Sequence, residues 1–224
     1  MAVNNNVEFP RRSMIRGTLG AAALGGITFL APHQAAQAAP FNDISRSVFK
    51  KEIEWMYNAG IAEGWSNGKF RPLAHIKRDA MAAFIYRFSG SPQTKFTNVF
   101  VDVPQKLIFS HEISWMKAQG ISWGWTDGTF RPYDTMKRDA MAAFLYRLLD
   151  RRLRYSGVNI KVDSVPQFKD VSSNRVFAHE IRWMKASGIS KGWSDGTYRP
   201  DSPVCRQDMA AFIYRAAQLA DKAA

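Results

Sequence analysis

The chain has 224 residues, of which 46% are hydrophobic and 22% charged, a balance that is typical of a globular protein and excludes a disordered chain. Its formal net charge of +12 indicates an anionic partner: nucleic acid, an acidic lipid headgroup or an acidic polysaccharide. The single cysteine, Cys205, excludes an intramolecular disulfide, so packing must stabilise the fold. We interpret Cys205 as a small, partly buried side chain.

Residues 1–38 have the pattern of a signal peptide. Arg11-Arg12 opens it, a Gly- and Ala-rich apolar run follows, and Ala36-Gln37-Ala38 has the small-x-small form of a cleavage site. The apolar run is too short and too weakly apolar for a membrane span. The arginine pair resembles a twin-arginine signal, and an ordinary secretory signal is the alternative. We therefore expect a secreted chain without a membrane span, and export argues against nucleic acid as the partner.

Three related units follow, which we place at residues 41–88, 100–149 and 168–219, and each has the pattern helix, loop, helix. The first helix of each unit places large apolar residues at i, i+4 and i+7: Phe49, Ile53 and Met56; Phe109, Ile113 and Met116; Phe177, Ile181 and Met184. A glycine that can end a helix in the left-handed conformation comes next in each unit: Gly60, Gly120 and Gly188. The second helix carries Met and Phe on one face.

Linkers separate the units, at residues 89–99 and, in a longer and basic form, at residues 150–167. A unit of this size cannot bury both apolar faces alone, whereas three units can share one core. We therefore predict an all-α fold of three packed repeats with the apolar stripes inside. No catalytic constellation, phosphate loop or metal-ligand cluster stands out. We expect no cofactor and no metal, because His111 and His179 are replaced by Lys51 in the first unit.

One loop recurs in every unit, Gly-Trp-x-Asp-Gly-x-Phe-Arg-Pro, with Asn or Tyr as the only substitutions at the named positions. It occupies residues 64–72, 124–132 and 192–200. The Asp-Gly and Asn-Gly pairs predict tight turns, and the proline sets the chain direction before the second helix. We expect the loop aromatics to plug into the core: Phe70, Phe130 and Tyr198.

The candidate binding residues are arginines that begin the second helices and tryptophans of the loops: Arg78, Arg138 and Arg206; Trp65, Trp125 and Trp193. A guanidinium can hold a carboxylate bidentately, and an indole can stack on the apolar face of a sugar. The alternative is that each arginine pairs with a nearby acid, such as Asp79, Asp139 or Asp208, and only staples the helix. Both interpretations stay open for these arginines. For the loop arginines we favour the staple: Arg71, Arg131 and Arg199.

The loop, the Gly-Ile pair, the Arg-led helix and a Phe-x-Asp-Val motif (residues 100–103 and 168–171) together resemble the S-layer homology (SLH) domain in all three units. The resemblance implies a pseudo-threefold helical assembly that anchors secreted proteins non-covalently to the cell wall. Family members commonly bind pyruvylated secondary cell-wall polysaccharide in grooves between repeats. Their Thr-Arg-Ala-Glu motif is altered here: only its arginine is kept in all three units, and Lys77 and Lys137 replace two threonines. These lysines would add cationic groups to the site.

We therefore expect a non-enzymatic, secreted cell-envelope protein whose partner is an anionic cell-wall polysaccharide. It would be a surface anchor or an S-layer-like component. Because the motif departs from the family pattern, a pyruvylated glycan does not follow from the resemblance. The alternatives are a repeat module that binds another surface protein and, with less support, a wall hydrolase.

Overall fold

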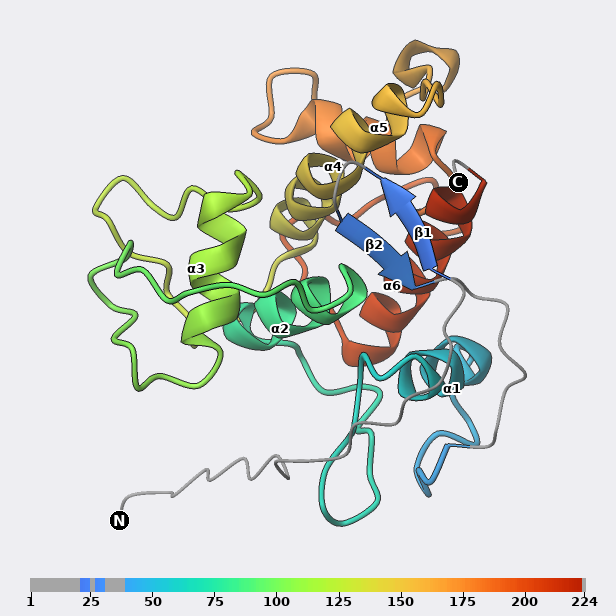
Figure 1. Cartoon of the computed structure of the whole chain (residues 1–224). Coiled ribbons are helices and arrows are strands. Elements are labelled where there is room, and N and C mark those ends of the chain that lie inside the picture. The colour runs from blue at the N-terminus through green and yellow to red at the C-terminus, as the bar shows by residue number, and fades with distance from the viewer. Residues whose placement is uncertain (1–20, 25–26, 31–38, 223–224) are drawn as a thin grey trace.

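The computed structural model describes residues 21–24, 27–30 and 39–222, and in these residues each repeat contributes two α-helices (Figure 1). The helices are α1 Lys50–Asn58, α2 Arg78–Phe88, α3 Ser110–Ala118, α4 Arg138–Tyr155, α5 Ala178–Ala186 and α6 Arg206–Asp221, with a short 3-10 helix η1 at Val162–Ser164. The predicted all-α fold of the repeats is confirmed. Ahead of them, strands β1 Ala21–Leu24 and β2 Ile27–Leu30 pair antiparallel. The predicted signal peptide otherwise lies outside the described residues.

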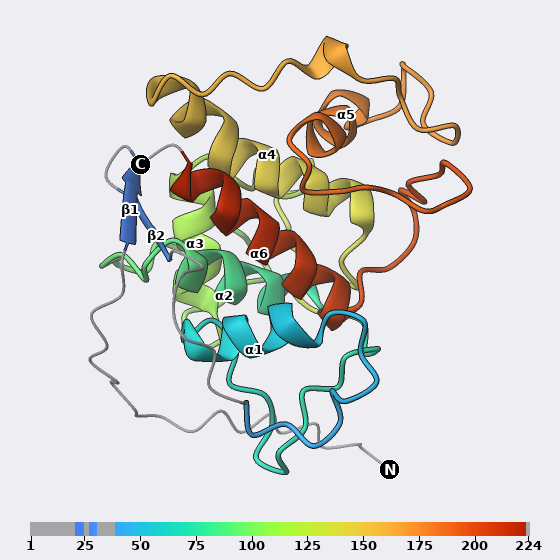
Figure 2. The same cartoon turned by 90° about the vertical axis from the view of Figure 1, so that its right-hand side faces the viewer.

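From the helix-loop-helix pattern we expected each repeat to form a helical hairpin, but each first helix instead packs on the second helix of another repeat. The pairs are α1 with α6, α2 with α3, and α4 with α5. One edge-to-face pair of rings, with centroids 5.3 to 5.5 Å apart, marks each interface: Trp55 with Tyr214, Trp115 with Tyr86, and Trp183 with Tyr146. Figures 1 and 2 show α1, α3 and α5 outside α2, α4 and α6. The last repeat therefore closes onto the first.

A ring of backbone hydrogen bonds joins the three repeats at the segments that precede the second helices. The amide of Ile76 donates to Val204, that of Val204 to Met136, and that of Met136 to Ile76, each at 2.9 Å. All three side chains are buried, so the ring is shielded from water. Because each repeat gives and receives one bond, the ring fixes the pseudo-threefold relation of the repeats.

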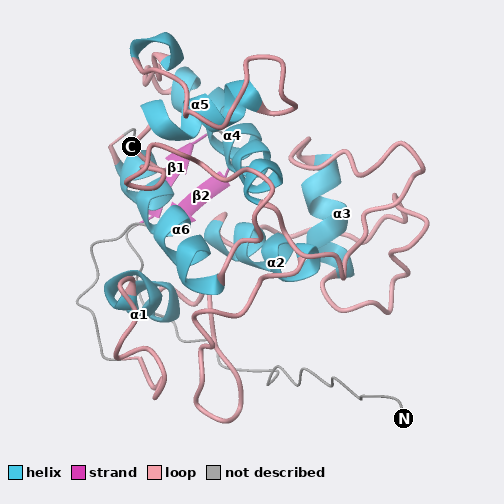
Figure 3. Cartoon of the chain, turned by 180° about the vertical axis from the view of Figure 1, so that it is seen from behind, coloured by secondary structure: helices cyan, strands magenta, loops and turns pink. Residues whose placement is uncertain are grey.

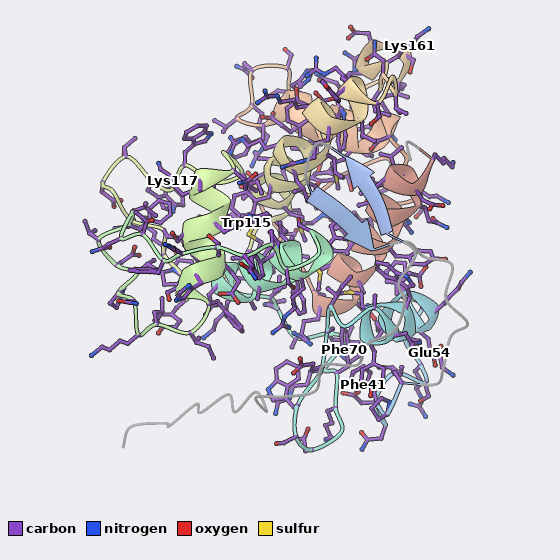
Figure 4. All side chains as sticks on the ribbon, viewed as in Figure 1. Phe41, Glu54, Phe70, Trp115, Lys117 and Lys161 are labelled. Carbon is purple, nitrogen blue, oxygen red and sulfur yellow. The ribbon has the colours of Figure 1, made fainter. Side chains whose placement is uncertain are left out.

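The apolar stripes form one hydrophobic core that runs through all three repeats. The loop aromatics Phe70, Phe130 and Tyr198 are fully buried, which confirms their role as plugs. Figure 4 shows Phe70 beside Phe41 of the same repeat, and their ring centroids are 5.4 Å apart. The predicted helix-ending glycines are also confirmed, since all three have positive φ: Gly60, Gly120 and Gly188.

The aspartate of the Phe-x-Asp-Val segment holds the recurring loop in place. Both carboxylate oxygens of Asp102 accept backbone N–H groups, from Phe130 at 2.8 Å and from Arg131 at 2.7 Å. Asp43 and Asp170 make the same pair of bonds in their repeats. The loop arginine has φ of 57° at Arg131, a left-handed conformation that most residues avoid. The carboxylate stabilises that conformation, and this role was not evident from the sequence.

Two boundary expectations need correction. The predicted linker at residues 150–167 begins inside α4, which continues to Tyr155. The extension is helical because Leu153 is fully buried and Asp150 accepts the indole N–H of Trp183 at 2.8 Å. The second correction concerns Phe49, Phe109 and Phe177, which we placed in the core. They precede their helices and are only half-buried. Figure 3 shows that loops, rather than helices, form the outer side of the molecule.

Candidate functional site

The first residue of each second helix is an arginine whose backbone is tied to the loop of another repeat. The amide of Arg78 donates to the carbonyl of Asp134 at 3.0 Å, that of Arg138 to Ser202 at 3.1 Å, and that of Arg206 to Ala74 at 3.0 Å. The residue before each arginine makes no side-chain cap. Backbone carbonyls of the neighbouring loop therefore accept the first N–H groups of the helix in place of a capping side chain.

The arginine side chains lie in the seams between repeats. Each Nε donates to the carbonyl of a plug aromatic of another repeat: Arg78 to Phe130 and Arg138 to Tyr198 at 2.8 Å, and Arg206 to Phe70 at 2.7 Å. All three arginines are buried, with at most 7% of the residue exposed. They are therefore partly structural, but their tie is to a neutral carbonyl and not to an acid.

Each guanidinium also lies against aromatic rings. Arg138 is 4.1 Å from the ring centroid of Trp193 and 5.2 Å from that of Phe212. Arg206 is 4.3 Å from that of Trp65 and 5.4 Å from that of Phe84. The structure thus brings each predicted arginine together with one predicted tryptophan.

The Arg78 guanidinium is 6.0 Å from the ring centroid of Trp125 and 5.5 Å from that of Phe144. Its nearest ring is that of Phe130, at 4.7 Å. Contacts of this kind between a cation and a ring face are attractive and strengthen when water is excluded.

The positive charge of these arginines is not neutralised by an acid. In the described part of the chain, no carboxylate lies within ion-pair distance of Arg78, Arg138 or Arg206, and their terminal nitrogens have no protein partner. These nitrogens are not sealed from the surface. Desolvation lowers the pKa of Arg78 to about 10 and that of Arg206 to about 9, and it also lowers the pKa of Arg138. The groups stay protonated at neutral pH and favour an anion in the seam.

A pocket of about 310 Å³ opens at the Arg138 seam. Its walls come from all three repeats: Phe49, Arg138, Ser190, Lys191, Gly192, Trp193, Asp208, Ala211, Phe212 and Arg215. Two cations, Lys191 and Arg215, accompany Arg138, and one acid, Asp208, faces them. Burial raises the pKa of Asp208, and the Arg138 charge opposes that shift. The pocket is cationic with aromatic walls, a combination suited to an acidic sugar.

Sequence reasoning missed a second set of seam arginines, which lie nine residues after the first set. The guanidinium of Arg215 is 5.7 Å from the ring centroid of Phe49, and those of Arg147 and Arg87 make the matching contacts with Phe177 and Phe109 at 5.4 and 5.9 Å. Their recurrence after a tyrosine in every second helix was the available signal.

We name each seam by its first arginine. The Arg78 seam holds Trp125, Phe144, Arg147 and Phe177; the Arg138 seam holds Trp193, Phe212, Arg215 and Phe49; the Arg206 seam holds Trp65, Phe84, Arg87 and Phe109.

The remaining predicted residues lie elsewhere. Lys77 and Lys137 are exposed and extend toward another repeat's loop: the Lys77 ammonium is 5.4 Å from the Tyr133 ring centroid, and Lys137 is 3.8 Å from Asp201. Lys137 does not line the Arg138 pocket. The ammonium groups of these lysines therefore face a neighbouring loop, and their place in the binding site stays a prediction.

The loop arginines stack on the tryptophans, and two of them pair with an acid of their own loop, whereas the first loop has Asn67 in place of the acid. Arg131 lies 2.9 Å from Asp127, and Arg199 lies 3.0 Å from Asp195. These are the pairs that the staple interpretation requires, although the acids differ from those that we named. Each loop tryptophan is thus contacted by two arginines, since the loop arginine approaches the ring centroid of Trp65 and of Trp193 at 4.5 Å and that of Trp125 at 4.2 Å.

The described residues contain no group of three or more His, Cys, Asp or Glu side chains that could hold a metal ion. Among the helices of the same residues, none has the length and apolar character needed to cross a bilayer.

This fold and these seams define a protein of three helical repeats closed into a ring, with a cationic, aromatic pocket where repeats meet. The S-layer homology domain family matches residues 40–82, 99–142 and 167–210, which is more than half of the chain. The chain belongs to this family, as the resemblance of its loops predicted.

Relatives with curated descriptions are similar over most of this chain. An amylopullulanase of Thermoanaerobacterium thermosulfurigenes is 28% identical over 86% of this chain and 10% of its own length. A cellulosome-anchoring protein of Acetivibrio thermocellus is 26% identical over 70% of this chain and 35% of its own length. A surface-layer 125 kDa protein of Lysinibacillus sphaericus is 27% identical over 89% of this chain and 16% of its own length. The chain thus spans about a third or less of each of these relatives.

Proposed function

We propose that this chain is a cell-surface anchoring module that binds an anionic secondary cell-wall polysaccharide in the seams between its repeats. The observation that supports the proposal most is the buried guanidinium of Arg138, which has no acid partner and lies 4.1 Å from the Trp193 ring centroid in the wall of a pocket. An acidic sugar could give its anion to the guanidinium and an apolar ring face to the indole.

The family and the relatives support the same role. Proteins described as cellulosome-anchoring and surface-layer proteins share the repeats, so an anchoring function outside the cytoplasm fits this chain. The similarity to an amylopullulanase covers only 10% of that enzyme, and we propose that the repeats bind and do not catalyse. The net charge of +12 favours an acidic polymer of the wall.

Sedimentation of the full chain with purified cell walls tests the proposal, before and after the secondary polysaccharide has been stripped. We expect binding to intact walls and its loss on stripped walls. The combined change Arg78→Lys, Arg138→Lys and Arg206→Lys keeps the charge but removes the planar fork, and it should weaken binding at least about tenfold. Arg46→Lys with Arg151→Lys is the matched control on exposed arginines.

Far-UV circular dichroism and urea unfolding establish that each variant is folded, because the seam arginines also hold neighbouring loops. Undiminished binding to stripped walls would contradict the polysaccharide and favour a surface protein as partner. Clearing of wall material in a gel assay would support the alternative that the chain is a wall hydrolase.

A further inference from the structure

The three seams share one plan but differ in how closely the arginine covers the tryptophan. The distance from the guanidinium to the indole centroid is 4.1 Å in the Arg138 seam and 4.3 Å in the Arg206 seam. In the Arg78 seam it is 6.0 Å. Although Arg131 lies 4.2 Å from its ring centroid, Trp125 is 48% exposed, which is more than Trp65 or Trp193. The indole of the Arg78 seam is therefore the most accessible of the three.

The residue two positions before each tryptophan also differs. Lys191 holds this position in the third repeat and lines the Arg138 pocket. The equivalent residue is Trp123 in the Arg78 seam and Glu63 in the Arg206 seam. Trp123 is 61% exposed, and its ring is contacted by Lys117, whose ammonium lies 5.3 Å from the ring centroid. The second repeat thus exposes two indoles, separated by Gly124.

Gly124 fixes the turn between the two indoles. Its φ is +72°, and a Cβ atom there would meet the Phe100 ring at 2.3 Å and the Thr129 carbonyl at 2.6 Å. Only glycine fits, so the chain direction on either side of Gly124 is set by packing. Trp123 and Trp125 are therefore displayed by a constrained loop and not by a mobile one.

Acidic residues separate the seams further. The Arg138 pocket contains Asp208, whose equivalents are Ala140 in the Arg78 seam and Ala80 in the Arg206 seam. The Arg206 seam has Glu63 instead. The Arg78 seam is the one of the three with no acid at either position, although Asp134 and Asp102 act on the Arg78 charge from other parts of the second repeat.

We propose that the Arg78 seam is the principal glycan site, and that Trp123 is a second stacking surface that binds the next sugar ring. This inference rests on the proposed function and names the site and the ligand length. Its ligand is an acidic oligosaccharide of at least two pyranose rings, with the anion at Arg78 and Arg147 and the apolar ring faces on Trp125 and Trp123. Lys117 adds a cation beside the outer ring.

Calorimetric titration of the full chain with size-fractionated fragments of stripped wall polysaccharide tests this. Trp123→Ala and Trp125→Ala should each weaken binding at least about fivefold for long fragments. The matched changes Lys191→Ala and Trp193→Ala, at the same positions of the third repeat, should each weaken it by a smaller factor than their counterparts in the Arg78 seam do. For the shortest fragments, Trp123→Ala should have no effect, because one ring reaches only Trp125.

The results distinguish a failure of the seam ranking, of the second stacking surface and of the proposed function. If the parent binds long fragments and Trp193→Ala weakens binding as much as Trp125→Ala does, the ranking of the seams is wrong while the proposed function stands. Parent-like binding by Trp123→Ala overturns the second stacking surface. If the parent binds no fragment of any length, the proposed function fails and this inference fails with it. Because Trp123 is mostly exposed, its variant should keep the parental unfolding midpoint.

Discussion

Arg206, at the start of the last helix, donates a hydrogen bond of 2.7 Å from its Nε to the carbonyl of Phe70 in the first repeat. The two residues are 136 positions apart. Together with the packing of α1 on α6, this bond closes the repeats into a ring. In an open array of repeats each unit contacts only its neighbours, and the ends can unfold separately. The closed ring has no ends, so the three repeats should behave as one cooperative unit.

The first prediction concerns this cooperativity. Phe70→Ala empties a fully buried position at the seam and should lower the free energy of unfolding by about 3–5 kcal/mol. Urea unfolding followed by tryptophan fluorescence and by far-UV circular dichroism should give coincident single transitions for both parent and variant. Val48→Ala, at a position that is 80% exposed, should change stability by less than about 0.5 kcal/mol. Two separated transitions in the parent would contradict the closed ring.

The second prediction concerns the aspartate that holds the loop. Asp102→Ala removes two hydrogen bonds to the backbone of Phe130 and Arg131, and the left-handed Arg131 loses its support. Since a hydrogen bond to a charged group contributes about 1.5–3 kcal/mol, we expect a loss of about 3 kcal/mol in urea unfolding. Asp134→Ala, an exposed change in the same repeat, serves as the control. Equal stabilities of the two variants would mean that the carboxylate does not hold the loop.

The third prediction concerns pH and the buried Asp79. Burial raises the pKa of this carboxyl, and the nearby Lys77 charge only partly opposes the shift. A folded-state pKa above the unfolded value means that ionised Asp79 destabilises the fold at neutral pH, and that this effect disappears as the pH falls through the ordinary Asp pKa of about 3.9. Asp79→Asn should therefore raise the melting temperature at pH 7, and its advantage over the parent should shrink toward pH 4.

The equivalent residue in the second repeat, Asp139, is the matched control because it has a partner. Arg175 of the third repeat lies 3.2 Å from Asp139. The second repeat has Leu107 at the position of Arg175, so Asp79 has no matching cationic partner. Asp139→Asn should lower stability at pH 7 by up to about 1 kcal/mol. The account of Asp79 is wrong if both asparagine variants shift the melting temperature in the same direction.

The fourth prediction separates the seam arginines from the lysines that precede them. Lys77→Ala and Lys137→Ala should change the dissociation constant for wall polysaccharide less than twofold, because these exposed side chains contact Tyr133 and Asp201 and leave the guanidinium groups untouched. Calorimetric titration measures this beside Arg138→Lys, for which a clear loss is expected. A loss from either lysine variant as large as that from Arg138→Lys would place the lysines in the site.

Local features of this fold could be predicted from the sequence, because local chemistry determines them. Gly60 ends a helix since it tolerates positive φ, and Phe70 is buried since a large ring in a tight loop has nowhere else to pack. The pairing of α1 with α6 could not be predicted, because every second helix has a similar apolar face and periodicity does not choose among them. The same holds for Asp150, whose partner Trp183 is 33 residues away.

The geometry of the candidate site could be predicted in part. Recurrence of arginine and tryptophan at matching positions identified Arg138 and Trp193, which the fold brings within 4.1 Å. The carbonyl that Arg138 contacts belongs to Tyr198, and no sequence pattern specifies a partner on another repeat's backbone. Arg215 recurs just as regularly, but its place in the seam depends on Phe49 of a different repeat. The contacts between repeats that complete the candidate site therefore depend on the closed ring and could not be predicted from one repeat.

The most direct test of the central claim is a titration of the isotope-labelled chain with wall polysaccharide fragments, followed by the indole N–H signals of its seven tryptophans. We predict saturable shifts of the seam tryptophans, largest for Trp125, and constant signals for the core residues Trp55, Trp115 and Trp183. Shifts confined to the core signals, or no shift of Trp65, Trp125 and Trp193 while the chain binds the fragments, would contradict binding in the seams.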